Sequence, residues 1–497
     1  MKIALVECPM FNVRMPMLGP AYLRAVLEKN GHSVDSFDLN IRLFHQVPLD
    51  MRKYWDYAFS LLWSSRGINS GWQDAGLLSH LEFLSESLLN DWAQEILKSN
   101  AQVIGFTVYH TSVDVSVILA KKIKQLDATR KIIFGGPFVL SYIDVCDDAV
   151  ANIHSPIHRV LDVIDMVAVG EGEDIMLDVV NRVSSGSSLE GCRGVIAKEN
   201  GNLTINELRP LICDLDALPF PDFSVLKEFA YTEKNFLPIL ASRGCPSRCS
   251  FCDYPYMDRY TFRARKASCV VEEMERQIAR YKTDFFHFND SSITLNVSFL
   301  TKLCQLLIEK KLRVRWGGSA SVNSVLTRDI FERMKQAGCE YLSFGIESAS
   351  PKVLQAMNKG FHIQDAEKNI MDAHAAGISA LTNWVVGHPM ESSRDFQETL
   401  DFIKKNSECM AGIDAAICTV KPHTPLYEMK DRYGIQLNNL HDWSAKDNSD
   451  TYGHRVQRLK LLQEQLPDKF ARDRVGGTLD VESALSLGEK KGKDVLL

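Results

Sequence analysis

The sequence has no long apolar run, no surplus of basic residues, and no internal repeat or low-complexity segment. A helix that crosses a bilayer needs roughly 20 consecutive apolar residues, and no stretch of this 497-residue chain approaches that composition. The first apolar run, KIALVE, is too short for a signal peptide. We therefore expect a cytoplasmic protein without a membrane span, whose cysteines stay mostly reduced.

The charge balance also excludes one class of partner. The formal net charge is −6, whereas sequence-independent binding to long nucleic acids needs a basic surface. The hydrophobic content of 45% and the charged content of 24% are typical of a globular protein. The length predicts two or three domains.

Residues 1–185 alternate short apolar runs with helical patterns. Strands are expected over 2–7, 32–39, 101–109, 131–140 and 163–170. Apolar strands separated by helices indicate a parallel sheet that is covered on both faces. We therefore predict a Rossmann-like α/β domain, interrupted by a helical insertion over about 41–100.

A second alternating series occupies residues 237–430, after an irregular linker over 186–236 that contains LPFPDF. Its six expected strands are LPILAS, DFFHFND, RVRWGGSA, EYLSFGIES, ISALTNWVVG and IDAAICTV. Six βα units fall short of the eight in a closed TIM barrel. We therefore predict a partial (β/α)6 TIM-like barrel, followed by a C-terminal extension over 431–497.

The segment RGCPSRCSFCDYP places Cys245, Cys249 and Cys252 directly after the first expected barrel strand. Barrels of this type place their chemistry at that end of the strands. A structural zinc site wants four ligands, commonly in two pairs, but no second cysteine pair and no nearby histidine completes the set here. Three thiolates suffice to hold a [4Fe–4S] cluster by three of its irons, which leaves the fourth iron open.

The eight residues CPSRCSFC match the CxxxCxΦC motif of the radical S-adenosylmethionine (radical SAM) enzymes, with Phe251 as the aromatic residue. In that family SAM chelates the open iron through its amino and carboxylate groups. An electron from the cluster cleaves SAM to a 5′-deoxyadenosyl radical, which abstracts hydrogen from the substrate. The resemblance thus implies a [4Fe–4S] cluster, SAM, and an external electron donor such as flavodoxin or ferredoxin.

The same resemblance assigns roles at the ends of later strands. Glu347 and Ser348, in GIES, would contact the ribose or the amino-acid part of SAM. Asn289 and Asp290, in FHFND, would lie near its methionine end, although ordinary strand-end capping explains Asp290 equally well. Gly387, in WVVGHP, would lay its backbone against the adenine, and Phe251 of the cysteine motif is the sixth residue expected at SAM.

The order of the N-terminal elements resembles the cobalamin-binding domain of the class B radical SAM methyltransferases. The matching segments are MPMLGPAYLRAVLEKNGHSVDSFDLN, VIGFTVY, FGGPF and DMVAVGEGE. Such a sheet binds its ligand beyond the strand C-termini, so the expected cobalamin contacts are Gly135, Gly136, Gly170, Glu171 and Gly172. The Asp-x-His-x-x-Gly signature is absent, which leaves His110 as a candidate lower-face ligand that is more often structural.

Together these features imply a cobalamin-dependent radical SAM C-methyltransferase that acts on an unactivated carbon of a small molecule or natural-product intermediate. One alternative is radical SAM rearrangement, dehydration or cyclisation, with cobalamin absent or not donating methyl. Another is a non-catalytic iron–sulfur or zinc protein that binds a partner. Methylthiolation is disfavoured, because residues 1–145 contain only Cys8 for a second cluster.

Overall fold

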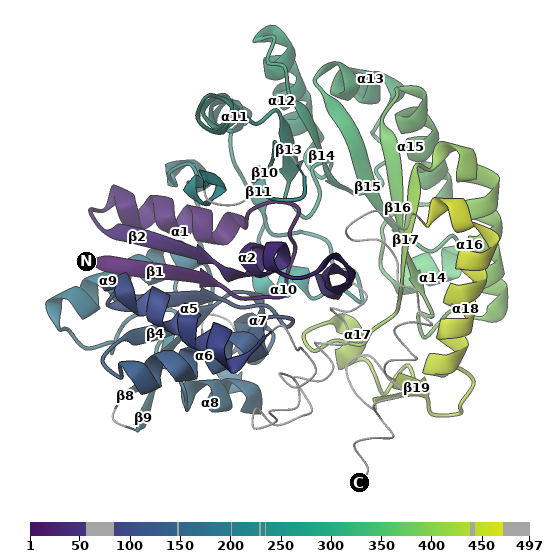
Figure 1. Cartoon of the computed structure of the whole chain (residues 1–497). Helices are drawn as coiled ribbons and strands as arrows, with labels where there is room; N and C mark the ends of the chain where they lie inside the picture. The colour runs from purple at the N-terminus through teal and green to yellow at the C-terminus, as the bar shows by residue number, and fades with distance from the viewer. Residues whose placement is uncertain are drawn as a thin grey trace. The chain divides into compact units, whose positions relative to one another are not determined.

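The structure is a computed structural model that describes residues 1–55, 84–146, 149–199, 201–227, 230–233, 235–437 and 443–470. The chain divides into two units, Met1–Lys234 and Asn235–Leu497 (Figure 1). Within the described ranges, no helix is long and apolar enough to cross a membrane. The 56–83 part of the expected insertion and the last 27 residues of the C-terminal extension, 471–497, lie outside these ranges.

The first unit contains a seven-stranded sheet in the order β2-β1-β3-β4-β7-β8-β9. Its strands are β1 (Lys2–Glu7), β2 (Ser33–Asp38), β3 (Val103–Thr107), β4 (Lys131–Gly135), β7 (Met166–Ala168), β8 (Val195–Glu199) and β9 (Asn202–Ile205). The first five in the sheet are parallel, which confirms the Rossmann-like fold. β8 and β9 add an antiparallel edge within the stretch expected to be irregular. β9 is largely exposed, so it carries little of the apolar pattern by which strands are recognised.

Helices cover both faces of this sheet. α1 (Leu18–Lys29) and α9 (Gly172–Ser185) supply apolar side chains to the core on one face. α2 (Leu39–Gln46), α5 (Glu86–Lys98) and α6 (Val113–Leu126) pack on the other face. The short elements of this unit are α7 (Pro137–Leu140), α8 (Ser155–Leu161), β5 (Ile143–Cys146) and β6 (Ala149–Ile153).

The second unit contains a six-stranded parallel sheet in chain order. Its strands are β10 (Phe236–Ile239), β13 (Phe285–Phe288), β14 (Arg315–Ala320), β15 (Cys339–Glu347), β16 (Ser379–Val386) and β17 (Gly412–Ile417). The connecting helices are α11 (Ala267–Tyr281), α12 (Val297–Glu309), α13 (Arg328–Gln336), α14 (Pro351–Ala356), α15 (Ile363–Ala375) and α16 (Ser393–Asn406). This arrangement confirms the partial (β/α)6 barrel.

Smaller elements surround the barrel strands. A two-stranded ribbon, β11 (Ser242–Arg243) with β12 (Arg263–Ala264), follows β10, and α10 (Tyr254–Met257) lies between its strands. After β17 come α17 (Pro425–Glu428), the hairpin β18 (Ile435–Leu437) and β19 (Trp443–Ala445), and α18 (Tyr452–Gln465). The described part of the C-terminal extension therefore contains regular secondary structure.

Strand alternation sets which barrel residues reach the inner face. In β15, Leu342, Phe344 and Ile346 are fully buried, while the residues between them are partly accessible. Because helices cover the outer face, Ser343 and Glu347 belong to the inner face. Ser343 Oγ lies 3.2 Å from Asn383 Oδ1 of β16, so the barrel interior is polar towards its carboxyl end.

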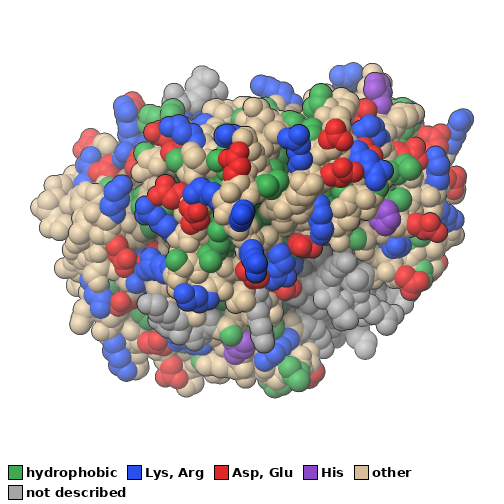
Figure 2. All heavy atoms as spheres, turned by 90° about the horizontal axis from the view of Figure 1, so that it is seen from above, with side chains coloured by type: hydrophobic (Ala, Val, Ile, Leu, Met, Phe, Trp, Pro, Cys, Tyr) green, Lys and Arg blue, Asp and Glu red, His purple; other side chains and the backbone are tan. Residues whose placement is uncertain are grey.

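On the face drawn in Figure 2, Lys and Arg side chains are interspersed with Asp and Glu side chains. On this face the charges of the two signs are therefore mixed rather than gathered by sign.

Candidate active site

At the start of the loop that carries the three cysteines, hydrogen bonds hold both the N–H and the carbonyl group of Ala241. The Ala241 N–H donates to Asp290 Oδ2 at 3.0 Å, and the Ala241 carbonyl accepts from the Arg265 N–H at 2.8 Å. The Ser242 hydroxyl donates to Asp290 Oδ1 at 2.5 Å. Burial raises the pKa of Asp290 to about 6. Both oxygens of Asp290 thus fix the start of the loop, while its expected contact with SAM stays a prediction.

Gly244 makes the tight turn immediately before Cys245. Its φ is +85°, and a β-carbon there would lie 1.9 Å from the Thr261 carbonyl oxygen. The Gly244 carbonyl accepts from Ser291 Oγ at 2.8 Å. Only glycine can be accommodated at this position, because the loop passes so close to the backbone of Thr261, just before β12 begins.

The three cysteines are half-buried and form no disulfide. Burial raises the pKa of the Cys252 thiol to about 11 and also raises that of Cys249, which the nearby Lys359 ammonium lowers in part. A buried thiol becomes a thiolate readily only beside positive charge, which iron would supply. In the part of the chain that the structure describes, no three His, Cys, Asp or Glu side chains converge on a single ion. A cluster spreads its ligands over several irons, so this donor set fits a cluster.

A buried histidine holds the middle of the loop. The Met390 N–H donates to His388 Nδ1 at 3.3 Å, so Nε2 carries the proton and donates to Ser250 Oγ, also at 3.3 Å. The Ser250 N–H donates to the Met357 carbonyl at 2.9 Å. Burial lowers the pKa of His388 to about 4, which keeps the ring neutral at physiological pH.

Glu347 ends β15 in a left-handed conformation, with φ of +73°, where the register against β16 shifts. Its Oε1 lies 3.4 Å from Lys359 Nζ, and the Lys359 ammonium lies 5.9 Å from the ring centroid of Phe251. A β-carbon at Gly345 would lie 2.8 Å from Glu347 Oε1. The glycine therefore gives the carboxylate its space, and one lysine connects the strand end to the cysteine loop.

The electrostatics of Glu347 depend on its neighbours. Burial raises its pKa, the Lys359 ammonium lowers it, and the charge of Asp414 on β17 raises it again. The lysine is therefore the group that favours a charged carboxylate at this position.

The other residues expected at SAM have varied surroundings. Asn289 is exposed. Ser348 is fully buried, and its Oγ lies 3.3 Å from Thr399 Oγ1 on α16. Gly387 has φ of +80°, and a β-carbon there would lie 2.2 Å from Arg455 Cδ on α18. The structure thus groups Phe251 and Glu347 with the cysteine loop, while the SAM-binding roles of all six expected residues stay predictions.

Sequence reasoning missed Lys359 and His388. Lys359 is one lysine among many, and its only signal is its place before Gly360 in MNKGF. His388 lies inside WVVGHP, where its apolar neighbours were a sign of burial.

The glycines expected to contact cobalamin lie at the carboxyl edge of the first unit's sheet, and they differ in which protein atoms lie nearest to them. A β-carbon at Gly136, whose φ is +103°, would lie 2.8 Å from the Val108 carbonyl oxygen, so this glycine lets β3 and β4 close on each other. At Gly135 and Gly170 the nearest atoms would be 3.7 Å and 3.9 Å away. A β-carbon at either position would make ordinary van der Waals contact, so the roles of both glycines at cobalamin stay predictions.

Glu171 and His110 both have protein partners. Glu171 Oε2 accepts from the Ile212 N–H at 2.6 Å, and Gly172 begins α9 beside it. His110 Nε2 lies 3.1 Å from Ser141 Oγ. With that bond kept, only Nδ1 of His110 could reach a metal, and its role as a cobalt ligand stays a prediction.

Three buried polar atoms in the described residues near this edge have no hydrogen-bond partner: Glu7 Oε2, Thr111 Oγ1 and the Tyr142 hydroxyl. Glu7 ends β1, and Tyr142 follows α7. A ligand with polar groups on its rim would satisfy them, so the edge fits a corrinoid.

Comparison with known proteins agrees with this geometry. Residues 239–403 match the Radical SAM superfamily, a stretch that includes the cysteine loop, Glu347 and Lys359. The chain is 29% identical over 400 residues to an uncharacterized methyltransferase of Pyrococcus horikoshii, which covers 79% of this chain and 82% of that protein. It is 33% identical over 261 residues to the bacteriochlorophyllide d C-12(1)-methyltransferase of Chlorobaculum tepidum, covering 51% of this chain and 54% of that protein.

Among solved structures, the radical S-adenosylmethionine methyltransferase TsrM from Kitasatospora setae, with cobalamin and a [4Fe–4S] cluster bound, superposes with a TM-score of 0.66. The alignment covers 88% of this chain and 80% of that one at 17% identity, which establishes a shared fold. The likeness extends over both units. Residues 239–403 therefore form a radical SAM domain, and the chain as a whole shares its fold with a radical SAM methyltransferase that binds cobalamin.

Proposed function

We propose that this enzyme is a cobalamin-dependent radical SAM C-methyltransferase that acts on an unactivated carbon of a small molecule. The observation that carries the proposal is the cysteine loop at the carboxyl end of a six-stranded barrel, with the Glu347–Lys359 pair beside it. The relatives named as methyltransferases support the transfer of a methyl group. The TsrM fold, which holds cobalamin and the cluster, supports both cofactors.

Cys245, Cys249 and Cys252 would hold the cluster, and the open iron would take SAM. When bound, the cluster and SAM supply a hydrogen-abstracting radical, and cobalamin supplies the methyl group. The protein's own task is to hold the loop still. Asp290 does so at its start and His388 at its middle.

Glu347 would accept hydrogen bonds from the ribose hydroxyls or the amino group of SAM. Lys359 is a positioning residue, because its ammonium keeps the Glu347 carboxylate charged and aimed along the inner face of the barrel. Since a charged acceptor makes hydrogen bonds roughly twice as strong as a neutral one, this pair strengthens the hold on SAM.

The cluster must receive an electron for each cleavage of SAM, so we propose a flavodoxin or ferredoxin as the external donor. Free thiols and an iron–sulfur cluster persist best in a reducing compartment, for which reason we place the reaction in the cytoplasm. The substrate itself is a small molecule, as the methyltransferase relative that acts on bacteriochlorophyllide supports.

Methyl transfer is tested with SAM that carries a deuterated methyl group. The full chain, reconstituted without oxygen with iron, sulfide and hydroxocobalamin, is incubated with a reductant and a small-molecule extract of its source cells. We expect a labelled small molecule together with 5′-deoxyadenosine, and neither product from Cys249→Ala. Formation of 5′-deoxyadenosine without any labelled product would contradict methyl transfer and favour rearrangement or cyclisation.

A further inference from the structure

Glu7 is a buried residue at the end of β1, where the strand order of the first unit's sheet reverses direction. It pairs in register with Asp38 of β2 on one side and Thr107 of β3 on the other. α1, which follows β1, packs on one face of the sheet, while α6, which follows β3, packs on the opposite face. In open α/β sheets, ligands bind in the crevice that opens between such diverging connections.

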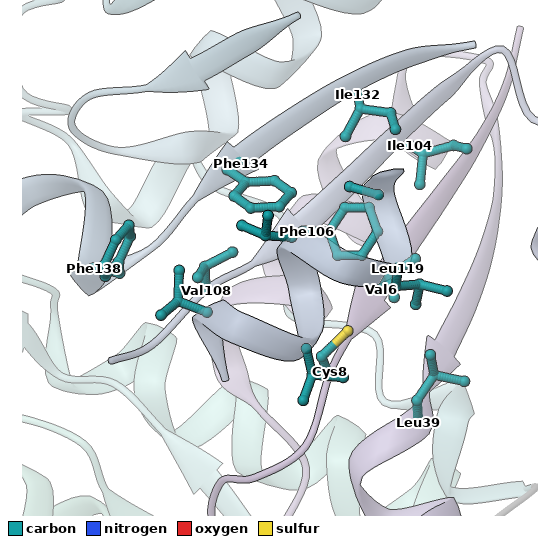
Figure 3. Packing of buried hydrophobic residues seen from close by; sticks show 14 of the residues in the cluster. Val6, Cys8, Leu39, Ile104, Phe106, Val108, Leu119, Ile132, Phe134 and Phe138 are labelled. Atoms are coloured by element: carbon teal, nitrogen blue, oxygen red, sulfur yellow. The ribbon is translucent and has the colours of Figure 1, made fainter. Parts of the chain in front are cut away.

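Nothing described in the protein satisfies one oxygen of this group. Glu7 is 5% exposed, and its Oε2 has no hydrogen-bond partner. Figure 3 shows the flanking residues Val6 and Cys8 within the apolar core beneath α6. Strand alternation therefore turns Glu7 towards the α1 face and away from that core.

The charge state of Glu7 follows from its neighbours. Burial raises the pKa of Asp38, while hydrogen bonds from the Ile41 N–H at 2.8 Å and from the Tyr231 hydroxyl, together with the charge of Arg42, oppose that rise and favour its ionised form. Burial, followed by the charge of Asp38, raises the pKa of Glu7 well above its ordinary value. Two neighbouring carboxyls with such different partners divide into one carboxylate and one neutral acid.

The other titratable groups that lie close enough to interact with the charge of Glu7 are neutral. Burial raises the pKa of the Cys8 thiol to about 12 and raises the pKa of the Tyr109 and Tyr231 hydroxyls. None of them supplies a positive charge that would ionise Glu7. Its carboxyl group is therefore a hydrogen-bond donor, which an acceptor on a ligand would satisfy.

We propose that Glu7, as a neutral acid, donates a hydrogen bond to an amide carbonyl on the rim of the corrinoid bound at this edge. The inference rests on the proposed function. A corrin ring carries amide side chains around its rim, and each amide carbonyl is an acceptor. An unpaired buried acid and a rim amide thus satisfy each other when the cofactor binds.

The test measures cofactor affinity in the full, cluster-loaded chain. Wild type, Glu7→Gln and Glu7→Leu are titrated with hydroxocobalamin by equilibrium dialysis near neutral pH and again at alkaline pH. We expect Glu7→Gln, which keeps a neutral donor, to bind within about twofold of wild type, and Glu7→Leu to bind roughly tenfold more weakly. Wild type should weaken at alkaline pH as Glu7 ionises, whereas Glu7→Gln should not.

Iron content and SAM binding, which report on the second unit, serve as folding controls and should not change in either variant. Equal affinity of Glu7→Leu and wild type would overturn the role of Glu7 and leave the proposed function intact. Equal weakening in Glu7→Gln and Glu7→Leu would overturn the donor role. A wild-type chain that binds no hydroxocobalamin would overturn both this inference and the cobalamin-dependent function.

Discussion

Lys359 Nζ lies 3.4 Å from Glu347 Oε1, and the two side chains are only 11% and 12% exposed. The pair joins the end of β15 to the segment after α14, and the same ammonium lies over the Phe251 ring of the cysteine loop. Removing one partner of a buried pair leaves the other charge without compensation. The Lys359 ammonium therefore favours the charged form of Glu347, the carboxyl group expected to bind SAM.

Replacement of Lys359 by methionine tests this control. Without the ammonium, the pKa of Glu347 rises further and the carboxyl becomes a neutral, weaker acceptor. We expect SAM affinity, measured by equilibrium dialysis, to fall roughly tenfold at unchanged iron content, and Lys359→Arg to restore most of it. The matched control is Lys352→Met, which breaks a more exposed pair with Asp395. Unchanged affinity in Lys359→Met would show that the pair is structural.

The turn at Gly244 tests how the cluster loop is held. An alanine there would place its β-carbon 1.9 Å from the Thr261 carbonyl oxygen, at a φ that disfavours any side chain. We expect Gly244→Ala to lose most of its bound iron after reconstitution, because Cys245 moves with the turn. Gly453→Ala on α18 is the control, since its β-carbon would meet only Thr451 Oγ1 at 3.8 Å. Wild-type iron content in Gly244→Ala would contradict this role.

His388 predicts a dependence of stability on pH. Its folded pKa, about 4, lies below the ordinary value of 6.5 because the ring is buried. As the pH falls, His388 therefore takes up a proton in the unfolded chain before it does so in the folded chain. The stability that the neutral ring contributes is complete above the pKa of the unfolded chain and is lost on acidification. Between about pH 7.5 and about pH 5 the loss amounts to about 2 kcal/mol.

The measurement is urea unfolding of the full chain without oxygen across that range. His388→Gln keeps a donor for Ser250 but does not titrate, so its unfolding free energy should lack the loss that His388 causes. Equal pH dependence in wild type and His388→Gln would mean that other groups govern acid stability.

The sequence predicted those features that local pattern determines. The spacing of Cys245, Cys249 and Cys252 and the βα alternation around it were sufficient for the barrel and the family. They did not predict that Lys359 pairs with Glu347, because that contact depends on how the segment after α14 returns to the end of β15.

Long-range packing also accounts for the remaining differences. The expected contact of the Gly387 backbone with SAM stays a prediction, and the structure adds a packing reason for glycine there: Arg455, which comes 68 positions later in the chain, would collide with a β-carbon. Glu7 carried no signal, since an acidic residue after an apolar strand is ordinary until its burial and its unpaired oxygen are known. β9 escaped notice because an exposed edge strand lacks a strong apolar pattern.

The most direct test of the account is the count of iron, sulfide and corrinoid per chain in protein purified without oxygen from cells supplied with cobalamin. The account predicts about four irons held by three cysteines, together with one corrinoid, and loss of the iron but not the corrinoid in Cys249→Ala. Cys213→Ala, which changes an exposed cysteine far along the chain from the loop, should match wild type. Four irons without any corrinoid would contradict cobalamin-dependent methyl transfer, and retention of the full iron content by Cys249→Ala would contradict the cluster site itself.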